Sequence, residues 1–380
     1  MKHARDVAAA GKNRSRGNAL RRVLATPAAL LVVAVIAPAS APSVKPPVKT
    51  LGSFPGVARA FAYDAGRFAW TDSAFVLHVR TVHTKAQTTI GYTDWYGEYR
   101  SPVAGRRLVL EQRRLLWLST VGVMPDGLVD FVYTGTVGST HARKLASTNV
   151  YLWLSNGDYP TATIVGDAAG LSYGIAGAEQ SDPDGGPWEL VGGVWSIVSG
   201  EPQQAADAPP AYLLARAAGR IAIVPAVLIE RYSDWSYAAP GGTVEIRNAT
   251  SGALISSFPT GTVRALALSK NIAAVLEDNW VNLYNVATGE LLGSTSVPAD
   301  TAGELEIEGS RIVFRTNHAI KLLNAATGRV STLATTTPWR PSGVAIDGRT
   351  VAWAESKRIA PGEASRKTFK TRIRAITLAS

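Results

Sequence analysis

Apolar and polar residues alternate over short stretches along most of the chain, which predicts β-strands rather than helices. Three segments align without gaps: Val244–Ser257, Val281–Ser294 and Ile320–Leu333. Each contains an alternating strand, an Asn-x-x-Ser/Thr-Gly turn and a second strand. The Asn side chain can accept hydrogen bonds from the backbone that follows it, and glycine permits a positive φ. The repeat therefore predicts a β-hairpin with a defined turn.

A second short strand precedes each hairpin, and the chain carries seven copies of it. The first apolar residues of the copies, 39 to 56 residues apart, are Phe68, Leu115, Leu171, Ile221, Ile272, Ile312 and Val351. The residue two positions later is bulky in most copies, which suits packing between neighbouring repeats. Seven such repeats predict an all-β fold, a seven-bladed β-propeller of four-stranded antiparallel blades.

The repeats place one propeller domain at residues 40–380, after a targeting segment at residues 1–39. We expect the blades near residues 57–91, 105–148, 161–199, 211–259, 263–297, 304–336 and 341–380. In the third blade we place the last turn at Gly192-Gly193. The seventh blade has only three strands before the chain ends. The segment at residues 46–54, chiefly Val48–Phe54, should pair beside Arg372–Leu378 and close the ring, because an open ring leaves strand edges unpaired.

This combination of short strands and Asn-x-x-Ser/Thr-Gly hairpins resembles the TolB-like and WD-repeat-like propellers of exported bacterial proteins. The resemblance covers about residues 46 to 380. The Trp-Asp pair of true WD repeats is missing, and Asn stands where many relatives carry Asp before the turn. Because one propeller architecture hosts many functions, the resemblance implies the fold rather than an activity.

The first 39 residues differ from the rest of the chain. They contain seven basic residues and one acid, then the apolar run Val23–Ile36 and the small residues Ala37-Pro38-Ala39. This order is that of a secretory signal peptide, so we expect cleavage after Ala39 and a secreted protein, in the periplasm or at the cell surface. Retention as a membrane anchor is the alternative, although the apolar run is short and contains Pro27.

Charge and cysteine content narrow the possible partners. The whole chain has 39 Lys and Arg against 29 Asp and Glu, but without the first 39 residues the balance is 32 against 28. The excess charge belongs mainly to the targeting segment, so a nucleic-acid partner is not indicated, and a membrane partner only if that segment is an anchor. The absence of Cys excludes disulfides and cysteine nucleophiles. We expect a monomer.

One motif matches a catalytic signature. Gly170-Leu-Ser-Tyr-Gly174 has the G-x-S-x-G pattern of the hydrolase nucleophile elbow. An elbow requires a helix after the serine, whereas Ile175–Pro187 is rich in Gly, Asp and Pro. The repeat alignment instead places Ser172 at a small buried position of a strand. We therefore assign no catalytic residue.

Metal and cofactor signals are few. Asp182 and Asp184 supply oxygens that Ca²⁺ favours, but their segment lacks EF-hand spacing. His78 and His83 lie five residues apart, which places them on opposite faces of a strand and disfavours a zinc site. No phosphate-binding or dinucleotide motif occurs. We expect no cofactor, with Ca²⁺ at Asp182 and Asp184 as the alternative.

Aromatic and charged residues gather in loops that a propeller places on one face. With the strands of a blade lettered a to d from the inside, the b–c and d–a connections share that face, and they hold the long insertions. Their binding candidates are Asp94, Trp95, Tyr96, Tyr99, Asp158, Tyr159, Tyr232, Asp234, Trp235 and Tyr237. The last b–c connection adds Lys357, Arg358, Arg366 and Lys367.

These loops lead to a functional expectation. Stability requires only short turns, so loops enlarged on one face alone indicate contact there. We expect a non-enzymatic binding or scaffold propeller that engages a protein or a cell-envelope glycan through its b–c/d–a face. The alternative is a hydrolase or lyase that uses carboxylates such as Asp94 and Asp234 in a central pocket of that face.

The signal segment can be tested directly. If signal peptidase cuts after Ala39, N-terminal sequencing of the secreted product should begin at Ser40 or within a residue or two of it. Recovery of the intact N-terminus from a membrane fraction would show that the segment is an anchor.

Overall fold

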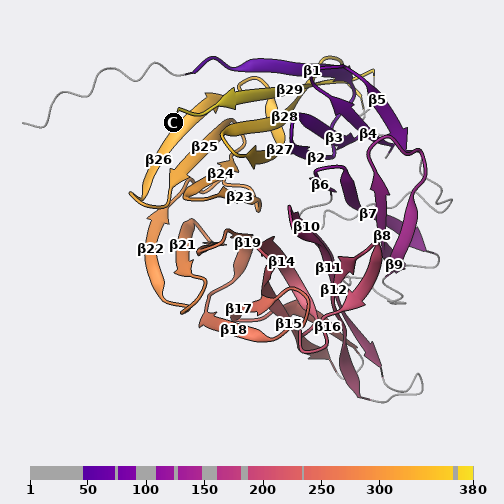
Figure 1. Ribbon diagram of the computed structural model, residues 1–380, viewed down its shortest axis with the longest axis vertical. Coiled ribbons are helices and arrows are strands. Elements are labelled where there is room, and N and C mark those ends of the chain that lie inside the picture. The colour runs from indigo at the N-terminus through magenta and orange to yellow at the C-terminus, as the bar shows by residue number, and fades with distance from the viewer. Residues whose placement is uncertain are drawn as a thin grey trace, which may run out of the picture. The chain divides into compact units, whose positions relative to one another are not determined.

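Seven antiparallel sheets are arranged in a ring in the computed structural model (Figure 1). The structure describes residues 46–72, 76–90, 108–123, 127–147, 161–180, 187–232, 235–362 and 367–379. The chain divides into two units, Met1–Val44 and Lys45–Ser380, and the described residues all belong to the second. These residues form strands and no α-helix. The predicted seven-bladed propeller is confirmed.

Each blade contributes its strands from the inside of the ring outwards. Blade 1 contains β2 (Ala60–Asp64), β3 (Arg67–Thr71), β4 (Leu77–Thr81) and β5 (Gln87–Ile90). Blade 2 contains β6 (Leu108–Glu111), β7 (Arg114–Val123), β8 (Gly127–Thr136) and β9 (Arg143–Ser147). Blade 3 contains β10 (Thr161–Asp167), β11 (Gly170–Gln180), β12 (Trp188–Val198) and β13 (Glu201–Gln204).

The remaining four blades follow the same order. Blade 4 contains β14 (Ala211–Ala217), β15 (Arg220–Tyr232), β17 (Thr243–Asn248) and β18 (Leu254–Pro259), with β16 (Trp235–Pro240) paired to β15. Blade 5 contains β19 (Val263–Leu268), β20 (Ile272–Glu277), β21 (Trp280–Asn285) and β22 (Leu291–Ser296). Blade 6 contains β23 (Leu305–Glu308), β24 (Arg311–Arg315), β25 (Ala319–Asn324) and β26 (Arg329–Thr335). Blade 7 contains β27 (Arg340–Asp347), β28 (Thr350–Arg358), β29 (Phe369–Thr377) and β1 (Lys49–Pro55).

The core lies between neighbouring blades. The seven strands recognised in the sequence are the b strands, and the bulky residues two positions after their first apolar residues are buried. Trp353 of blade 7, for example, packs with Val313 and Ile320 of blade 6. Burying such side chains is worth about 1.5–3 kcal/mol each, so contacts between blades hold the ring together.

The c–d turns form as the repeat predicts. The Asn285 side-chain oxygen accepts hydrogen bonds from the N–H groups of Ala287 and Thr288, at 2.8 and 3.2 Å. Gly289 has a φ of 75°, a conformation that glycine adopts without strain. Asn248 and Asn324 make the same pair of hydrogen bonds in blades 4 and 6.

The N-terminal strand closes the ring, as predicted. Strand β1 pairs antiparallel with β29, and Phe54 lies opposite Thr371. The Thr371 hydroxyl donates to the Gly56 carbonyl at 2.6 Å and accepts the Ala58 N–H at 3.2 Å. Phe54 also stacks on Trp70 of blade 1, with ring centroids 4.6 Å apart. The first residues of the propeller therefore join the last blade to the first.

The prediction of a turn at Gly192-Gly193 is wrong. Strand β12 runs unbroken through both glycines, and the turn falls at Ser199-Gly200, so blade 3 extends to Gln204 rather than to residue 199. Gly192 has a φ of 127°, and a Cβ there would lie 2.1 Å from the Ile175 carbonyl oxygen. The glycine serves a close approach between strands, which local sequence does not distinguish from a turn.

Several b–c connections expected to be loops are extended hairpins. The segment Arg231–Gly242 contains the end of β15 and all of β16, which pair as far as Tyr232 and Trp235. The β11–β12 pair continues to Gln180 and Trp188. β-Branched and aromatic residues favour the extended backbone, so the strands continue beyond the body of the blade.

Removing β1 should destabilise the propeller. Deletion of residues 40–56 leaves the edge of β29 unpaired and takes Phe54 from its contacts, so we expect a loss of at least about 3 kcal/mol. Thermal unfolding measures the effect. A shorter deletion of residues 40–45, which ends before β1, is the control and should leave the melting temperature unchanged. Equal melting curves for the long deletion and the full mature chain would contradict ring closure by β1.

Candidate functional site

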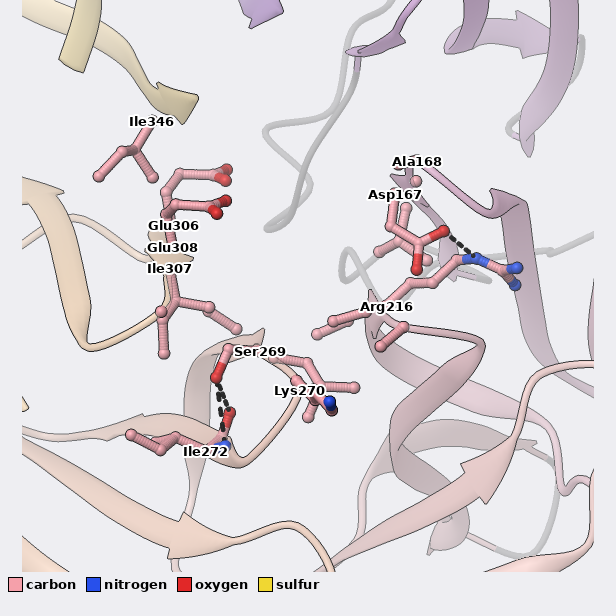
Figure 2. Close-up of a pocket in the computed structure, with 18 of the residues that line it drawn as sticks. Asp167, Ala168, Arg216, Ser269, Lys270, Ile272, Glu306, Ile307, Glu308 and Ile346 are labelled. Carbon is pink, nitrogen blue, oxygen red and sulfur yellow. Dashed lines mark hydrogen bonds and ion pairs between the residues drawn. The ribbon is translucent and has the colours of Figure 1, made fainter. Parts of the chain in front are cut away.

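The centre of the ring, which we call the channel, holds a cavity of about 850 Å³ at the end where the a–b turns lie. All seven blades line it, through the ends of their a strands and the turns that follow. Two cations, Arg216 and Lys270, line it together with six carboxylates: Asp64, Glu111, Asp167, Glu306, Glu308 and Asp347. Figure 2 shows Glu306 and Glu308 on one wall and the Asp167–Arg216 ion pair across from them.

Five of these carboxylates occupy one repeat position, the last residue of strand a. We call them the carboxylate ring: Asp64, Glu111, Asp167, Glu308 and Asp347. Equivalent positions in a propeller lie at one level of the channel, so the repeat itself gathers the acids. Blade 4 has Ala217 at this position and blade 5 has Leu268.

Three members of the ring join neighbouring blades. The Asp347 carboxylate accepts the N–H of Ala65 in the a–b turn of blade 1, at 2.8 Å. Asp64 likewise accepts the N–H of Gln112 in blade 2. Asp167 of blade 3 accepts the N–H of Gly219 in blade 4, at 3.4 Å. These carboxylates are therefore held in place by the next blade rather than free to rotate.

Arginines at the start of strand b complete the link between blades. Arg67 donates to the Gln112 carbonyl of blade 2 at 2.9 Å, and Arg220 donates to the Lys270 carbonyl of blade 5 at 3.2 Å. Arg114 and Arg311 make the same kind of contact with blades 3 and 7. In blade 1, Asp64 and Arg67, three residues apart, thus both bind Gln112 in the a–b turn of blade 2.

Burial and mutual repulsion act on the ring. Burial raises the pKa of Asp64, and the charge of Asp347 raises it further, while the Gln112 N–H and the Arg67 charge lower it. Burial and Asp347 also raise the pKa of Glu308, against the opposing charge of Arg311. Asp347 thus acts on a carboxylate in each adjacent blade, and negative charge is concentrated at this mouth of the channel.

Beside the cavity, a buried polar network connects blades 3 and 4. The Arg216 Nε donates to Asp167 at 3.0 Å, and its Nη1 donates to the Ser172 hydroxyl at 2.7 Å. Ser172 is fully buried and lies 3.0 Å from the Ser196 hydroxyl. A Cβ on Gly170 would lie 2.6 Å from Arg216, so this glycine makes room for the guanidinium.

The network explains the G-x-S-x-G match. Ser172 lies inside β11, which continues as a strand to Gln180. Its hydroxyl is held by Arg216 and Ser196, and no helix follows it. The prediction that Ser172 is a small buried strand residue is confirmed. An elbow serine needs an exposed hydroxyl on a strained turn, so this serine has the wrong surroundings for a nucleophile.

The cavity can hold water or a cationic group against carboxylates of fixed orientation. The Ser269 hydroxyl in its wall bonds the backbone of Ile272 and caps the turn there. Among the described residues, no three His, Asp or Glu side chains converge on a metal position. Asp182 and Asp184 lie outside the described residues, so Ca²⁺ binding there stays a prediction.

Most of the predicted binding residues also lie outside the described residues: Asp94, Trp95, Tyr96, Tyr99, Asp158, Tyr159, Asp234 and Arg366. The structure places Tyr232 opposite Trp235 at the end of the β15–β16 pair, with Tyr237 farther along β16. Lys357 and Arg358 end β28, and Lys367 precedes β29. The b–c/d–a face therefore carries these residues at the far side of the disc from the carboxylate ring.

The extended hairpins are confined to certain blades. Strands b and c pair as far as Val123–Gly127 in blade 2, Gln180–Trp188 in blade 3 and Tyr232–Trp235 where β16 continues blade 4. In blade 5 the pairing already ends at Glu277–Trp280. Val227 and Ile229 on β15 are 39% and 37% exposed. The hairpins thus present apolar surface beyond the body of the disc.

The carboxylate ring was missed from the sequence, although a signal for it exists. Asp64 and Arg67, Glu111 and Arg114, and Glu308 and Arg311 repeat one acid-x-x-Arg spacing. The spacing falls across each a–b turn. Aligning the turns as well as the strands would have placed these acids at one repeat position.

Comparison with protein families and with curated proteins identified no relative of this chain. The chain matches no family model, and no curated protein is significantly similar to it. The resemblance to TolB-like and WD-repeat-like propellers therefore stays a prediction. Within the described residues, no helix has the length and apolar character needed to cross a membrane.

Loss of Arg216 should destabilise the protein strongly. The Arg216 and Asp167 side chains are only 6% and 13% exposed, so Arg216→Ala leaves a buried carboxylate without its cation and removes one hydrogen-bond partner from each of two buried hydroxyls. We expect a loss of about 3 kcal/mol in unfolding free energy, measured by denaturant titration. The matched control is Arg143→Ala, which breaks the exposed pair with Glu201 and should cost less than about 1 kcal/mol. Similar losses in both variants would contradict the network's role.

Proposed function

We propose that the protein is an exported, non-enzymatic binding or scaffold module that engages a protein or a cell-envelope glycan through its b–c/d–a face. The observation that carries this proposal is the lengthening of the b–c hairpins in blades 2, 3 and 4. Blade 5 also has four strands and a buried core, although the pairing of its b and c strands already ends at Glu277–Trp280. Extra hairpin length is therefore not required by the fold and is available for contact.

The hairpins of blades 3 and 4 support each other. At the base of the two hairpins, Ala176 of β11 and Ala226 of β15 are buried together, and Leu190 of β12 and Tyr212 of β14 pack against them. Packed side chains give the pair a defined shape, which lowers the entropy lost when a partner binds. The two hairpins form a preorganised surface rather than two separate loops.

Two exposed apolar side chains on this surface, those of Val227 and Ile229, suit a macromolecular partner. Val227 and Ile229 are two residues apart on β15, so they face the same side. Tyr232 and Trp235 follow at the end of the hairpin. Apolar and aromatic side chains together are the composition of binding hot spots, and aromatic rings also stack on sugars. Trp95 and Asp94 in the connection after blade 1 are proposed to contribute to the same contact.

A second candidate, a hydrolase or lyase, has one observation in its favour. Asp64 and Glu308 line a water-accessible cavity, and burial with Asp347 raises the pKa of both carboxyls. Asp64 and Asp347, however, each accept a backbone N–H from the next blade. These contacts give the acids a structural role, so we rank binding first. The cavity also lies at the opposite end of the channel from the face where Asp94 and Asp234 were expected to act.

Substitutions on the two faces test the proposal. A partner isolated from envelope extract with the wild-type protein should bind Trp95→Ala and Trp235→Ala more weakly, by about 1–3 kcal/mol each if these residues are buried anchors. Val227→Ser with Ile229→Ser should weaken binding in the same direction. Calorimetric titration gives the affinities, and thermal unfolding should show that the variants fold.

The control uses apolar residues near the other face. Leu254 and Leu291 begin the outer strands directly after c–d turns and are 53% and 57% exposed. Leu254→Ala and Leu291→Ala should leave partner affinity unchanged. Loss of binding in these two variants, with normal binding in the Trp95 and Trp235 variants, would show that the face is wrongly assigned.

A further inference from the structure

We infer that the protein forms a two-fold dimer in which the outer strand of blade 5, β22, pairs with the same strand of a second copy. The contact lies on the rim of the ring rather than at either end of the channel. The inference therefore goes beyond the proposed function and does not depend on it. A dimer also differs from the monomer expected from the sequence.

Exposed apolar side chains gather on the outer part of blades 4 and 5. Leu254 and Ile255 begin β18 and are 53% and 40% exposed, and Leu291 and Leu292 begin β22 and are 57% and 54% exposed. Trp280, on the strand that pairs with β22, is 50% exposed. These are five of the eight large apolar side chains exposed among the described residues. Both outer strands lie on the rim (Figure 1), where such a patch indicates an interaction site.

Strand β22 offers backbone groups as well as side chains. It is the last strand of its sheet, so one of its edges has no neighbouring strand. The Val297 N–H donates to the Asn279 carbonyl at 2.8 Å, on the inner side of the strand. Because N–H groups alternate in direction along an antiparallel strand, those of Ser294 and Ser296 point away from β21. A further strand can therefore add to this edge.

Most other outer strands carry features that hinder edge pairing. A charged side chain opposes the approach of another strand, and proline removes an N–H donor. The residues of these two kinds are Lys49 and Pro55 in β1, Arg143 and Lys144 in β9, Glu201 and Pro202 in β13, Pro259 in β18 and Arg329 in β26. Strand β5 has neither feature, but its one apolar residue, Ile90, is 1% exposed. Among the seven described outer strands, β22 alone combines an open edge with exposed apolar side chains.

The charge of β22 favours a second copy as the occupant. A two-fold axis brings a patch against itself, so any net charge in the patch repels its own copy. The strand Leu291–Ser296 contains no charged residue, which removes this repulsion. A partner recognised by charge would find nothing to bind here.

The order of residues along β22 also makes the strand complementary to itself. Antiparallel pairing sets the leucine end of one strand beside the Ser296 end of the other. Trp280 lies opposite Ser296 in the register, so each dimer contact brings Trp280 of one chain next to the leucine end of the second chain. Leu292 lies at a register shift, so the pairing between copies runs along Gly293–Ser296, where small side chains allow the strands to approach closely.

Sedimentation velocity of the mature chain over a range of concentrations tests the inference. The protein should pass from one chain to two, with no larger species, because a two-fold contact closes on itself. Ser294→Pro removes an outward N–H and leaves the ladder to β21 intact, so it should abolish the dimer. Leu291→Ser with Leu292→Ser should weaken self-association at least about 100-fold, because two apolar contacts are lost on each chain. Thermal unfolding measures whether each variant folds.

Each variant has a matched control in another blade. The Ala205 N–H donates to the Val194 carbonyl at 2.9 Å, so the Gln204 N–H of β13 also points outwards. Gln204→Pro removes that donor and should leave the dimer unchanged. Val227→Ser with Ile229→Ser removes two exposed apolar side chains from β15 and should also leave the dimer unchanged.

Three outcomes would overturn the inference. A single chain at every concentration would leave the edge of β22 to an extended segment of another protein. Growth beyond two chains would exclude a two-fold contact, and unchanged dimerisation of the Ser294 or the leucine variant would place the contact elsewhere. If Ser294→Pro did not fold, the leucine variant would decide the question. The Val227 and Ile229 variant separates the two proposals, because it should weaken partner binding and leave self-association unchanged.

Discussion

Burial of apolar side chains between neighbouring blades is the interaction on which the rest of the structure depends. A single four-stranded sheet exposes two apolar faces to water, and only an adjacent sheet can cover them. Trp353 therefore packs on blade 6, and Phe54 packs on Trp70 of blade 1. Every blade needs a neighbouring sheet on both faces, so the row of blades must close into a ring. Strand β1 meets this condition by completing the last blade with residues from the start of the propeller.

Closure gives the two ends of the channel different roles. At one end the a–b turns approach each other closely, and acids and arginines bind them across the blade boundaries. The same carboxylates that join the blades make that mouth negative. Their geometry cannot change freely, because moving Asp347 would break its hydrogen bond to the next blade. Structural and electrostatic roles therefore coincide in the same residues.

The other end of the channel is free of this constraint. The b–c connections leave the disc, so a hairpin can lengthen without disturbing the packing between blades. Blades 3 and 4 use this freedom to build a packed pair of hairpins, and blade 7 uses it to extend a basic one. One face can bind partners while the other links the blades, because the two roles use different ends of the same strands.

The sequence by itself determined the repeat number, the three Asn-x-x-Ser/Thr-Gly c–d turns of blades 4, 5 and 6, and the closing strand. These features depend on local properties: alternation along a strand, the Asn285 side chain over its own backbone, and a missing strand in blade 7. Only the tertiary structure decided that Gly192 serves a close approach, that Arg231–Gly242 forms a hairpin, and that the acids share one ring. Asp347 and Ala65 are 282 residues apart and meet only once the ring is closed, so the periodicity of a single repeat carries no information about their contact.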